Sequence, residues 1–589
     1  MEAVDISGRM LKYGKMTNQE IAKNLREMAI LYEMEGVFFK PRAYEKAASG
    51  VEVSGEEMKD LYEKGGKEAL KKIPGVGEGI AFHIESLLKK GVFAEHERLK
   101  KKIPVNVSEL SAVEGVGPKM IKVLYKKLGV KNLKDLEKAG RSGKIRKLER
   151  FGQKSEEKIL KGIEFLKNSG GRRVLGIIAP ELNALLAMVK SFPEVETAII
   201  AGSARRKKET IGDLDILAVS KKPEIVMEKF ITLPQIANVL SKGKTKTMVI
   251  LKNGLDADLR VVPAGSYGAA LNYFTGSKDH NVKLRELAQK KGLKLNEYGL
   301  RNGNRQIAGK SEEEVYKKLG LSYIEPELRE NTGEIEASRA GKLPKLISYG
   351  DLKGDLQVQT DWTDGENSIE AMAEAAKKMG LEYIAITDHT KALAMTGGSD
   401  EKKLLKQMAA IDKLNSKFKI QNSKFRVLKG AEVNIMKDGS LDINDKTLAK
   451  LEVAGAAVHS HFNLTRAEQT RRIVSAMENP NVDIIFHLTG RVINKREPIE
   501  LDIDEIIMTA KRTGTVLEID AYPDRSDIRE EYIKRCVEAG IKMSIDSDAH
   551  SVQHFNFLEY GVSQARRGWA GKTDIINTCS AQEMLKLLK

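Results

Sequence analysis

Beyond about residue 348 the chain alternates short β-rich runs with helical segments, and this rhythm restricts its fold more than any other feature. The runs include residues 383–387, 454–458, 516–519 and 542–545, and several are followed directly by Asp, His or Glu. Parallel strands joined by helices carry their chemistry at the carboxyl ends of the strands. The pattern predicts a βα barrel, and an open doubly wound sheet is the alternative that the spacing leaves open.

The preceding residues follow other patterns. Charged and apolar residues alternate at helical spacing over 16–165, strand-like runs follow between about 170 and 270, and helical spacing returns over 278–320. The stretch 330–346 is polar and contains Gly and Pro, which is typical of a linker. A chain of 589 residues is long enough for several domains of roughly 100–200 residues each.

Charge and histidine are divided unequally along the chain. The net charge is +16 overall, but residues 346–589 contain 34 basic and 37 acidic residues, a net of −3, which leaves a net of +19 for residues 1–345. Six of the nine histidines lie in the C-terminal part. We therefore expect the first part to bind a polyanion and the second to hold metal.

The cysteine count and the absence of long apolar runs indicate the compartment. Two cysteines, Cys536 and Cys579, exclude a disulfide framework and a cysteine zinc cluster. No apolar run reaches the roughly 18–20 residues of a membrane span, and the N-terminal residues lack the core of a signal peptide. The expected location is the reducing cytoplasm, without a membrane partner.

A short glycine motif occurs twice in the basic part. Ile73-Pro-Gly-Val-Gly-Glu-Gly79 and Val113-Glu-Gly-Val-Gly-Pro-Lys119 are each followed by a predicted helix. Such a turn leaves backbone N–H groups free at a helix N-terminus, where they favour a phosphate. A plain helix–helix turn is the alternative, but two copies in a basic region favour DNA binding. The motifs resemble the helix-hairpin-helix of DNA repair proteins, and the expected DNA contacts are Gly75, Gly77, Gly115, Gly117 and Lys119.

A group of carboxylates follows in the strand-rich region. Asp213 and Asp215 are two residues apart, so in a strand both side chains project from one face. Such a like-charged pair requires cations, and two divalent ions shared with substrate phosphates would supply them. The preceding Gly202-Ser203 turn and Arg206 could contact those phosphates. A third carboxylate is expected from a neighbouring strand, where spacing alone does not choose between Asp256 and Asp258.

This region resembles the palm of the family X DNA polymerases, the group that includes DNA polymerase beta. The resemblance implies that Asp258 is the third metal ligand and that the ions are Mg²⁺ or Mn²⁺. It also implies contacts of Ser203 and Arg206 with the triphosphate, and of Arg260 with DNA. The matching residues are Gly202-Ser203, Arg205-Arg206, Gly212-Asp213-Leu-Asp215, Asp258-Leu-Arg260-Val-Val-Pro263 and Tyr273-Phe-Thr-Gly-Ser277 with Asn281. Gly202, Gly212, Tyr273, Phe274, Gly276 and Asn281 are the other nucleotide-binding residues that it implies.

The N-terminal helical region matches the same family with one departure. Lys40, Tyr44 and Lys71 match its 5′-phosphate pocket. Members with 5′-deoxyribose-phosphate lyase activity use a Schiff-base lysine, and in this chain His83 occupies that position. The resemblance therefore implies a gap-binding domain and leaves its lyase activity open.

The C-terminal part carries candidate metal ligands at its predicted strand ends. Mixed imidazole and carboxylate ligands suit zinc, manganese or iron. The strings around them resemble the polymerase-and-histidinol-phosphatase (PHP) domain, and so do Asn479-Pro-Asn-Val-Asp483, Thr489-Gly-Arg491 and Ala565-Arg-Arg-Gly-Trp569. The resemblance implies a distorted βα barrel with three metals, a manganese-dependent 3′→5′ exonuclease and an abasic-site endonuclease. The candidate ligands are Asp364, His389, Glu432, His459, His487, Asp548 and His550.

Two expected ligands of this domain are replaced. The family opens the domain with His-x-His, whereas this chain has Gln357 and Gln359. An amide oxygen is a far weaker ligand than imidazole for a transition metal. A working nuclease with altered metals, a weak nuclease and a structural remnant all stay open, as does partial replacement by His461. We expect fewer than three Zn²⁺ or Mn²⁺ ions and favour an impaired nuclease.

The combined prediction is a multidomain DNA-directed DNA polymerase that fills short gaps in DNA repair. Gapped or primed duplex DNA and deoxynucleoside triphosphates are the expected partners, and a monomer is the expected state. The alternatives are a metal-dependent phosphoesterase whose first half only delivers DNA, a non-catalytic DNA-end scaffold and a template-independent transferase. The predicted domains are a helical gap-binding domain (1–95), a fingers-like helical domain (96–168), an α+β nucleotidyltransferase palm (169–270), a thumb-like domain (271–329), a linker (330–347) and an α/β PHP barrel (348–589).

Overall fold

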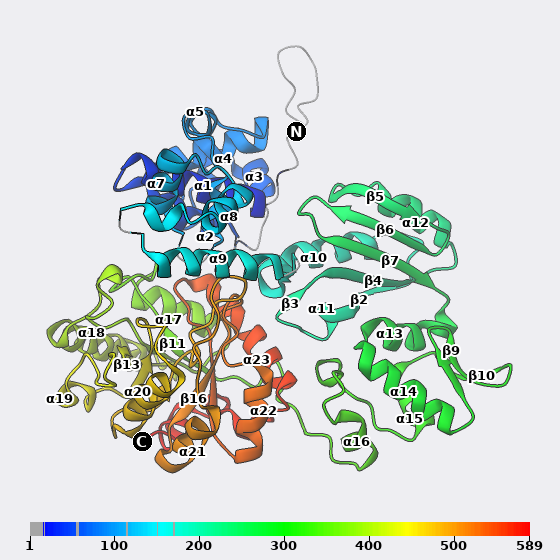
Figure 1. Ribbon diagram of the computed structural model, residues 1–589. Helices are drawn as coiled ribbons and strands as arrows, with labels where there is room; N and C mark the ends of the chain where they lie inside the picture. Colours follow the sequence, from blue (N-terminus) through cyan, green and yellow to red (C-terminus); the bar gives the residue numbers. More distant parts are fainter. Residues whose placement is uncertain are drawn as a thin grey trace. The chain divides into compact units, whose positions relative to one another are not determined.

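The computed structural model divides the chain into two compact units. It describes residues 16, 18–52, 54, 58–113, 116–149, 151–168 and 171–589, so the expected DNA contact Gly115 lies outside the described residues. The described residues before Gly171, together with Asn494–Arg496, form one unit. Gly171–Ile493 and Glu497–Lys589 form the other (Figure 1).

The first unit is helical in its described part. Both glycine motifs precede an amphipathic helix: α4 begins after Gly77 and α7 after Gly117, each glycine having an extended backbone. Each helix ends at a left-handed glycine, Gly91 or Gly129, which has no Cβ to clash there. The helices are α1 (Asn18–Glu35), α2 (Lys40–Glu52), α3 (Met58–Leu70), α4 (Glu78–Lys90), α5 (Ala94–Lys102), α6 (Val107–Ser111), α7 (Pro118–Leu128), α8 (Leu133–Arg141) and α9 (Gln153–Asn168).

The second unit begins with a five-stranded sheet in the order β2-β4-β7-β6-β5. Within it β4 and β7 are parallel, and the other neighbours are antiparallel. Leu214 and Ile216 of β4 pack in a buried core with Leu182 and Phe230 of the adjacent helices. The alternating residues of β4 therefore point to the opposite face of the sheet. The elements are β1 (Arg173–Val174), α10 (Leu175–Lys190), β2 (Thr197–Ile200), α11 (Gly202–Arg205), β3 (Thr210–Ile211), β4 (Asp213–Val219), α12 (Pro223–Ile231), β5 (Ile236–Lys242), β6 (Lys246–Leu251) and β7 (Asp256–Val262).

A small α/β region follows the sheet. Its three strands pair antiparallel in the order β10-β9-β8, and its core includes Leu284, Leu300 and Tyr316. The stretch that sequence predicts to be a linker contains helix α16, whose Glu334 is buried and lies 2.6 Å from Nδ1 of His280. The elements are α13 (Tyr267–Thr275), α14 (Lys278–Lys290), β8 (Lys294–Asn296), β9 (Gly299–Asn302), β10 (Arg305–Ala308), α15 (Glu312–Leu319) and α16 (Glu334–Arg339).

The last region is a nearly closed barrel of seven parallel strands in sequential order, β11 to β17 (Figure 1). The backbone N–H of Gln359 donates to the Ala549 carbonyl at 2.8 Å, which joins the first strand to the end of the last. The predicted barrel is thereby confirmed over the open sheet. Its elements are β11 (Gly354–Val358), α17 (Ile369–Lys378), β12 (Tyr383–Ile386), α18 (Glu401–Ile420), β13 (Arg426–Asn434), α19 (Asp445–Leu448), β14 (Val453–Ala457), α20 (Arg466–Glu478), β15 (Ile484–Ile485), α21 (Ile503–Thr513), β16 (Val516–Asp520), α22 (Glu530–Ala539), β17 (Met543–Asp546), α23 (Leu558–Arg567) and α24 (Ala581–Leu585).

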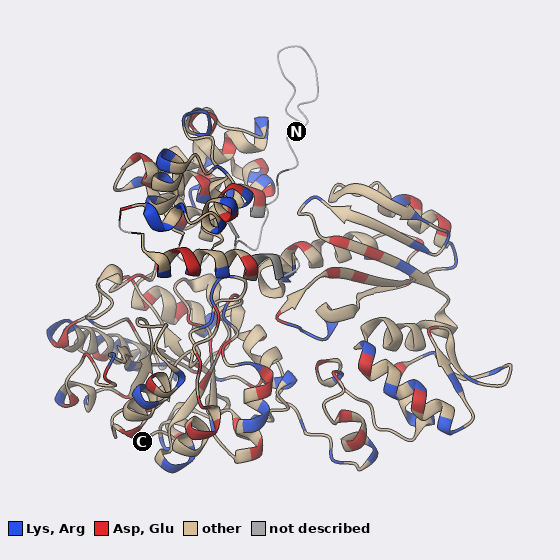
Figure 2. Cartoon of the chain, viewed as in Figure 1, with Lys and Arg blue, Asp and Glu red and all other residues tan. Residues whose placement is uncertain are grey.

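Charged residues are interspersed along both units. Figure 2 shows basic and acidic residues together on many of the helices. Among the described residues, no helix combines the length and the apolar character needed to cross a membrane.

Candidate functional site

The carboxylates of β4 and β7 lie side by side because the two strands are parallel and in register. Asp215 is paired with Asp258, and Asp213 with Asp256. Burial, together with the negative charges of Asp213 and Asp258, raises the pKa of Asp215 to about 6. Asp256 is exposed at the beginning of its strand, and Lys246 Nζ lies 3.1 Å from Asp258 Oδ2. Lys246 and Arg260 are two cations beside the three carboxylates Asp213, Asp215 and Asp258, so excess negative charge remains, which fits divalent cations.

Gly202 makes room for this carboxylate group. Its φ is 60°, in the left-handed region, and a Cβ atom on it would lie 2.3 Å from Asp215 Oδ2. Any other residue would displace either the backbone that precedes Ser203 or the Asp215 side chain. Glycine at position 202 is therefore explained by the close approach of α11 to β4.

A pocket of about 520 Å³ opens beside these carboxylates. It gathers nine residues that sequence singled out: Gly202, Ser203, Arg206, Asp213, Asp215, Tyr273, Phe274, Gly276 and Asn281. Asp258 and Gly212 are not among its lining residues, although a Cβ on Gly212 would lie 3.2 Å from the lining residue Arg172. Nδ2 of Asn281 donates to the Tyr273 carbonyl at 2.7 Å. The guanidinium of Arg260 lies 4.3 Å from the ring centre of Phe274.

Four further cations line the pocket, and sequence reasoning missed them as site residues. They are Arg172, Lys208, Lys278 and Arg285. Arg285 lies four residues after Asn281 in α14, so helical spacing could have indicated it. Lys208 and Arg172 come from separate loops and carry no comparable signal.

In the first unit, two of the expected 5′-phosphate contacts lie close to His83. The hydroxyl of Tyr44 is 2.6 Å from Nδ1 of His83, whose ring stacks on Phe93 at 4.4 Å. Lys40 Nζ donates to the Tyr32 hydroxyl at 3.3 Å. Burial lowers the pKa of His83, so its imidazole is neutral at pH 7.

The remaining expected contacts of this unit surround the glycine motifs. Lys71 lines a separate hollow of about 510 Å³ with Gly75 and Gly77, and its Nζ lies 3.0 Å from Glu78 Oε2. A Cβ on Gly75 would lie 2.6 Å from the backbone nitrogen of Ala47. In the second motif Gly117 precedes α7, and Lys119 is exposed in its first turn.

In the barrel, Glu432 is surrounded by imidazoles. Its carboxylate oxygens lie 2.7 Å from Nε2 of His487, 3.0 Å from Nε2 of His459 and 3.1 Å from Nδ1 of His389. Burial alone would raise the pKa of Glu432, but His389 and His459 hold it well below its usual range. The ligand atoms of His389, Glu432 and His459 lie within 4.8 Å of one another, and so do those of Asp364, His389 and His550. This histidine side fits a transition metal.

Two of the candidate ligands have a strained backbone. His487 and Asp548 have φ values of 28° and 48°, which non-glycine residues rarely adopt. Such strain clusters at functional sites, where the surrounding structure holds it in place.

On the other side of this cluster, two glutamines occupy the positions where the resemblance to the family predicts two histidine ligands. Gln357 and Gln359 are buried, and Gln359 Nε2 donates to Glu432 Oε2 at 2.9 Å. Neither amide atom of Gln357 has a hydrogen-bond partner among the described residues. Arg525 places its Nε 3.6 Å from Asp548 Oδ2, so a fixed positive charge stands beside this ligand. His461 is exposed and belongs to neither group of ligand atoms.

Sequence comparisons agree with this arrangement. The chain matches models of a helix-hairpin-helix domain over residues 16–93, a SAM-like helix-hairpin-helix tandem over 107–164, the DNA polymerase beta thumb over 270–330 and the PHP domain over 355–577. It is 35% identical to the DNA polymerase/3′-5′ exonuclease PolX of Bacillus subtilis (strain 168), over 98% of this chain and 100% of that protein. The chain belongs to the family X DNA polymerases with a C-terminal PHP domain.

Two partial relatives match separate parts of this family X polymerase. The DNA polymerase lambda of Rattus norvegicus is 25% identical over 53% of this chain and 56% of its own length. A probable phosphatase of Thermoanaerobacter sp. (strain X514) is 31% identical over 31% of this chain and 73% of its own length. The chain is therefore a DNA polymerase that acts on DNA and deoxynucleoside triphosphates, and the phosphoesterase alternative is not favoured.

Proposed function

We propose that the pocket beside β4 and β7 is the nucleotide site of a polymerase that fills short gaps during DNA repair. The observation that carries this proposal is the position of Asp213, Asp215 and Asp258 beside a pocket lined by Ser203 and Arg206. Two helix-hairpin-helix matches in the basic part support binding of duplex DNA around a gap. The proposed working form is a monomer in the cytoplasm.

The residues divide the polymerase reaction between them. Divalent ions, Mg²⁺ or Mn²⁺, held by Asp213, Asp215 and Asp258 would neutralise the phosphates and favour ionisation of the primer 3′-hydroxyl. In the proposed arrangement Asp258 is the ligand nearest the primer 3′-hydroxyl and would help to activate it for in-line attack on the α-phosphate, which expels pyrophosphate. Ser203 and Arg206 bind the triphosphate in the proposed arrangement.

The remaining pocket residues select the nucleotide. Tyr273, Phe274 and Asn281 lie along the pocket and would contact the sugar and the minor-groove edge of the base. The hydrogen bond from Asn281 to the Tyr273 carbonyl holds these two residues together.

The first experiment removes one carboxylate. Asp258→Ala should abolish nucleotide incorporation on a gapped duplex, because the proposed metal site loses a ligand, while DNA affinity stays close to that of the wild type. Incorporation is measured by primer extension and affinity by fluorescence anisotropy. Asp256→Ala is the matched control, since it removes an exposed carboxylate from the same strand. Undiminished synthesis by Asp258→Ala would contradict the assignment.

For the PHP domain we infer a weakened nuclease with fewer than three ions. The histidine side around Glu432 supports binding of Zn²⁺ or Mn²⁺, and the relative from Bacillus subtilis is named a 3′-5′ exonuclease. Gln357 and Gln359 replace the imidazoles that a third ion requires. When bound, the ions would activate water and polarise the phosphodiester. Glu432 holds His389, His459 and His487 around one point, which fixes their ring orientations.

The test is cleavage of a 3′-recessed duplex and of an abasic duplex in Mn²⁺. We expect slow cleavage that disappears in His487→Ala, because this imidazole contacts Glu432 directly. Polymerase activity of the same variant serves as the control and should be retained. Robust cleavage by the wild type would contradict the weakened state, and cleavage that survives His487→Ala would place the nuclease elsewhere.

A further inference from the structure

The PHP domain holds the palm segment that connects Ser203 to the carboxylate strand. This segment, residues 206–209, leads from α11 to β3. Nη1 of Arg567 donates to the Arg206 carbonyl at 2.9 Å, and Lys208 Nζ donates to Glu530 Oε1 at 3.0 Å. Glu209 also accepts a hydrogen bond from Arg491. Three positions between Ser203 and Asp213, namely Arg206, Lys208 and Glu209, thus contact the PHP domain.

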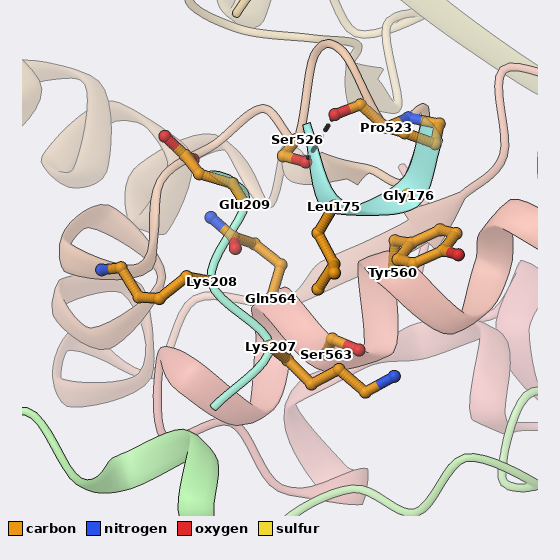
Figure 3. Close-up of a pocket in the computed structure, with 10 residues that line it drawn as sticks. All are labelled: Leu175, Gly176, Lys207, Lys208, Glu209, Pro523, Ser526, Tyr560, Ser563 and Gln564. Carbon is orange, nitrogen blue, oxygen red and sulfur yellow. Dashed lines mark hydrogen bonds between the residues drawn. The ribbon is translucent and has the colours of Figure 1, made fainter. Parts of the chain in front are cut away.

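The two surfaces fit closely around this segment. Figure 3 shows Lys207, Lys208 and Glu209 on one stretch of backbone, opposite Ser563 and Gln564 of α23. The space enclosed there is about 10 Å³, at most enough for a single water. A Cβ on the adjacent Gly176 would lie 2.6 Å from Pro523 Cβ. The segment therefore has little freedom to shift against the barrel.

Arg567 connects the two carboxylates that hold the pocket cations. Arg206 Nε donates to Glu330 Oε1 at 2.9 Å, and Nη1 of Arg567 lies 3.3 Å from the same oxygen. Glu530 accepts from both Lys208 and Arg567. The side chain of Arg567 is only 1% exposed. Each carboxylate is thus shared between one pocket cation and this buried arginine.

This sharing matters when a nucleotide binds. Arg206 and Lys208 line the pocket, so a triphosphate competes with Glu330 and Glu530 for their charges. A partly buried carboxylate that loses its only cation is strongly destabilised. A second cation that remains in place removes most of that cost.

We propose that Arg567 is a positioning residue of the polymerase reaction: it fixes the backbone of Arg206 and stays as counter-ion of Glu330 and Glu530 when Arg206 and Lys208 bind the triphosphate. The partner it serves is the triphosphate of an incoming nucleotide. This role rests on the proposed nucleotide site. It also gives a function to the Ala565-Arg-Arg-Gly-Trp569 string, which neither metal binding nor the nuclease explains.

The experiment compares two neighbouring arginines in the full-length enzyme. Single-nucleotide incorporation on a gapped duplex gives kcat and the KM for the deoxynucleoside triphosphate. Arg567→Met should raise this KM about five- to tenfold with kcat within about twofold of the wild type, because uniform binding of the triphosphate is weakened. The KM of Arg567→Lys should lie between those of the wild type and Arg567→Met. Arg566→Met is the control, since Arg566 binds Glu327 and the Ile347 carbonyl instead, and its KM should stay within about twofold.

Circular dichroism and thermal unfolding show which variants are folded. Equal KM values for Arg567→Met and Arg566→Met, or a fall in kcat without a change in KM, would overturn the proposal. If Arg567→Met does not fold, the KM of Arg567→Lys tests the proposal instead. A KM equal to that of the wild type in folded Arg567→Lys would also contradict the proposal. A wild type without incorporation would instead contradict the proposed nucleotide site.

Discussion

The palm and the PHP domain both gather acidic residues at strand ends, but they differ in how completely the expected ligand set is present. In the palm, Asp213, Asp215 and Asp258 lie on two paired strands, and the register of that single pair brings them together. In the PHP domain, the ligands come from several strands of a seven-stranded barrel, and two of the expected histidines are Gln357 and Gln359.

The difference shows how a site can be lost in part. One of the apolar clusters of the barrel domain contains Leu356, Phe486 and Met584. The fold therefore does not depend on every ligand, since apolar burial supplies most of its stability. Glu432 also has four partners within the protein: three imidazoles and the amide of Gln359. In the palm, Lys246 pairs with Asp258, but Asp213 and Asp258 still raise the pKa of Asp215 by their negative charge. We therefore expect that losing one ligand there removes the whole function.

The largest effect that tests this contrast comes from Gly202→Ala. A Cβ at this position would lie 2.3 Å from Asp215 Oδ2, so either the carboxylate or the Gly-Ser backbone must move. A displacement of about 1 Å in a catalytic group can cost roughly 100-fold in rate, and we expect a loss of at least that size in kcat for incorporation. Gapped-duplex extension measures it.

Gly265→Ala is the matched control for this prediction. Gly265 belongs to the same unit, and a Cβ there would meet no atom within 4 Å, so its kcat should be close to that of the wild type. If Gly202→Ala is as active as this control, the position of Asp215 does not depend on the absence of a Cβ at residue 202. The palm site would then tolerate change as well as the PHP site does, which would contradict the comparison.

Much of this organisation is visible in the sequence, because it depends on short-range patterns. The alternation of strands and helices predicts the barrel, and the two glycine motifs predict turns that lead into α4 and α7. The two-residue spacing of Asp213 and Asp215 places both carboxylates on one face. Each of these features is set by residues only a few positions apart.

The features that the sequence does not predict depend on contacts between residues that are distant in the chain. Spacing does not choose between Asp256 and Asp258; the strand register and burial that distinguish them belong to the folded sheet. Nothing near Lys208 in the sequence indicates its ion pair with Glu530, 322 residues away. The polar stretch around Glu334 resembles a linker, but in the folded chain Glu334 is buried and contacts His280 of α14.

A smaller effect is expected from changing Gln357 and Gln359, the two positions where the PHP domain lacks its expected histidine ligands. The double variant Gln357→His, Gln359→His introduces two imidazoles, one of them at the position where Gln359 contacts Glu432. We expect it to bind about one additional metal ion per chain. Manganese-dependent cleavage should rise about tenfold or more, the range by which neighbouring groups tune metal sites. Mass spectrometry of the dialysed protein gives the metal content, and a 3′-recessed duplex gives the cleavage rate.

The control for this restoration is Gln421→His, which adds an imidazole at an exposed position and should leave the metal content unchanged. Polymerase activity should be the same in all three proteins, because Asp213, Asp215 and Asp258 are untouched. An unchanged metal content in the double variant would show that the glutamines are not what excludes the ion. Arg525, 3.6 Å from Asp548 Oδ2, would then be the group that does so, since its fixed charge already compensates the carboxylate that an ion would need.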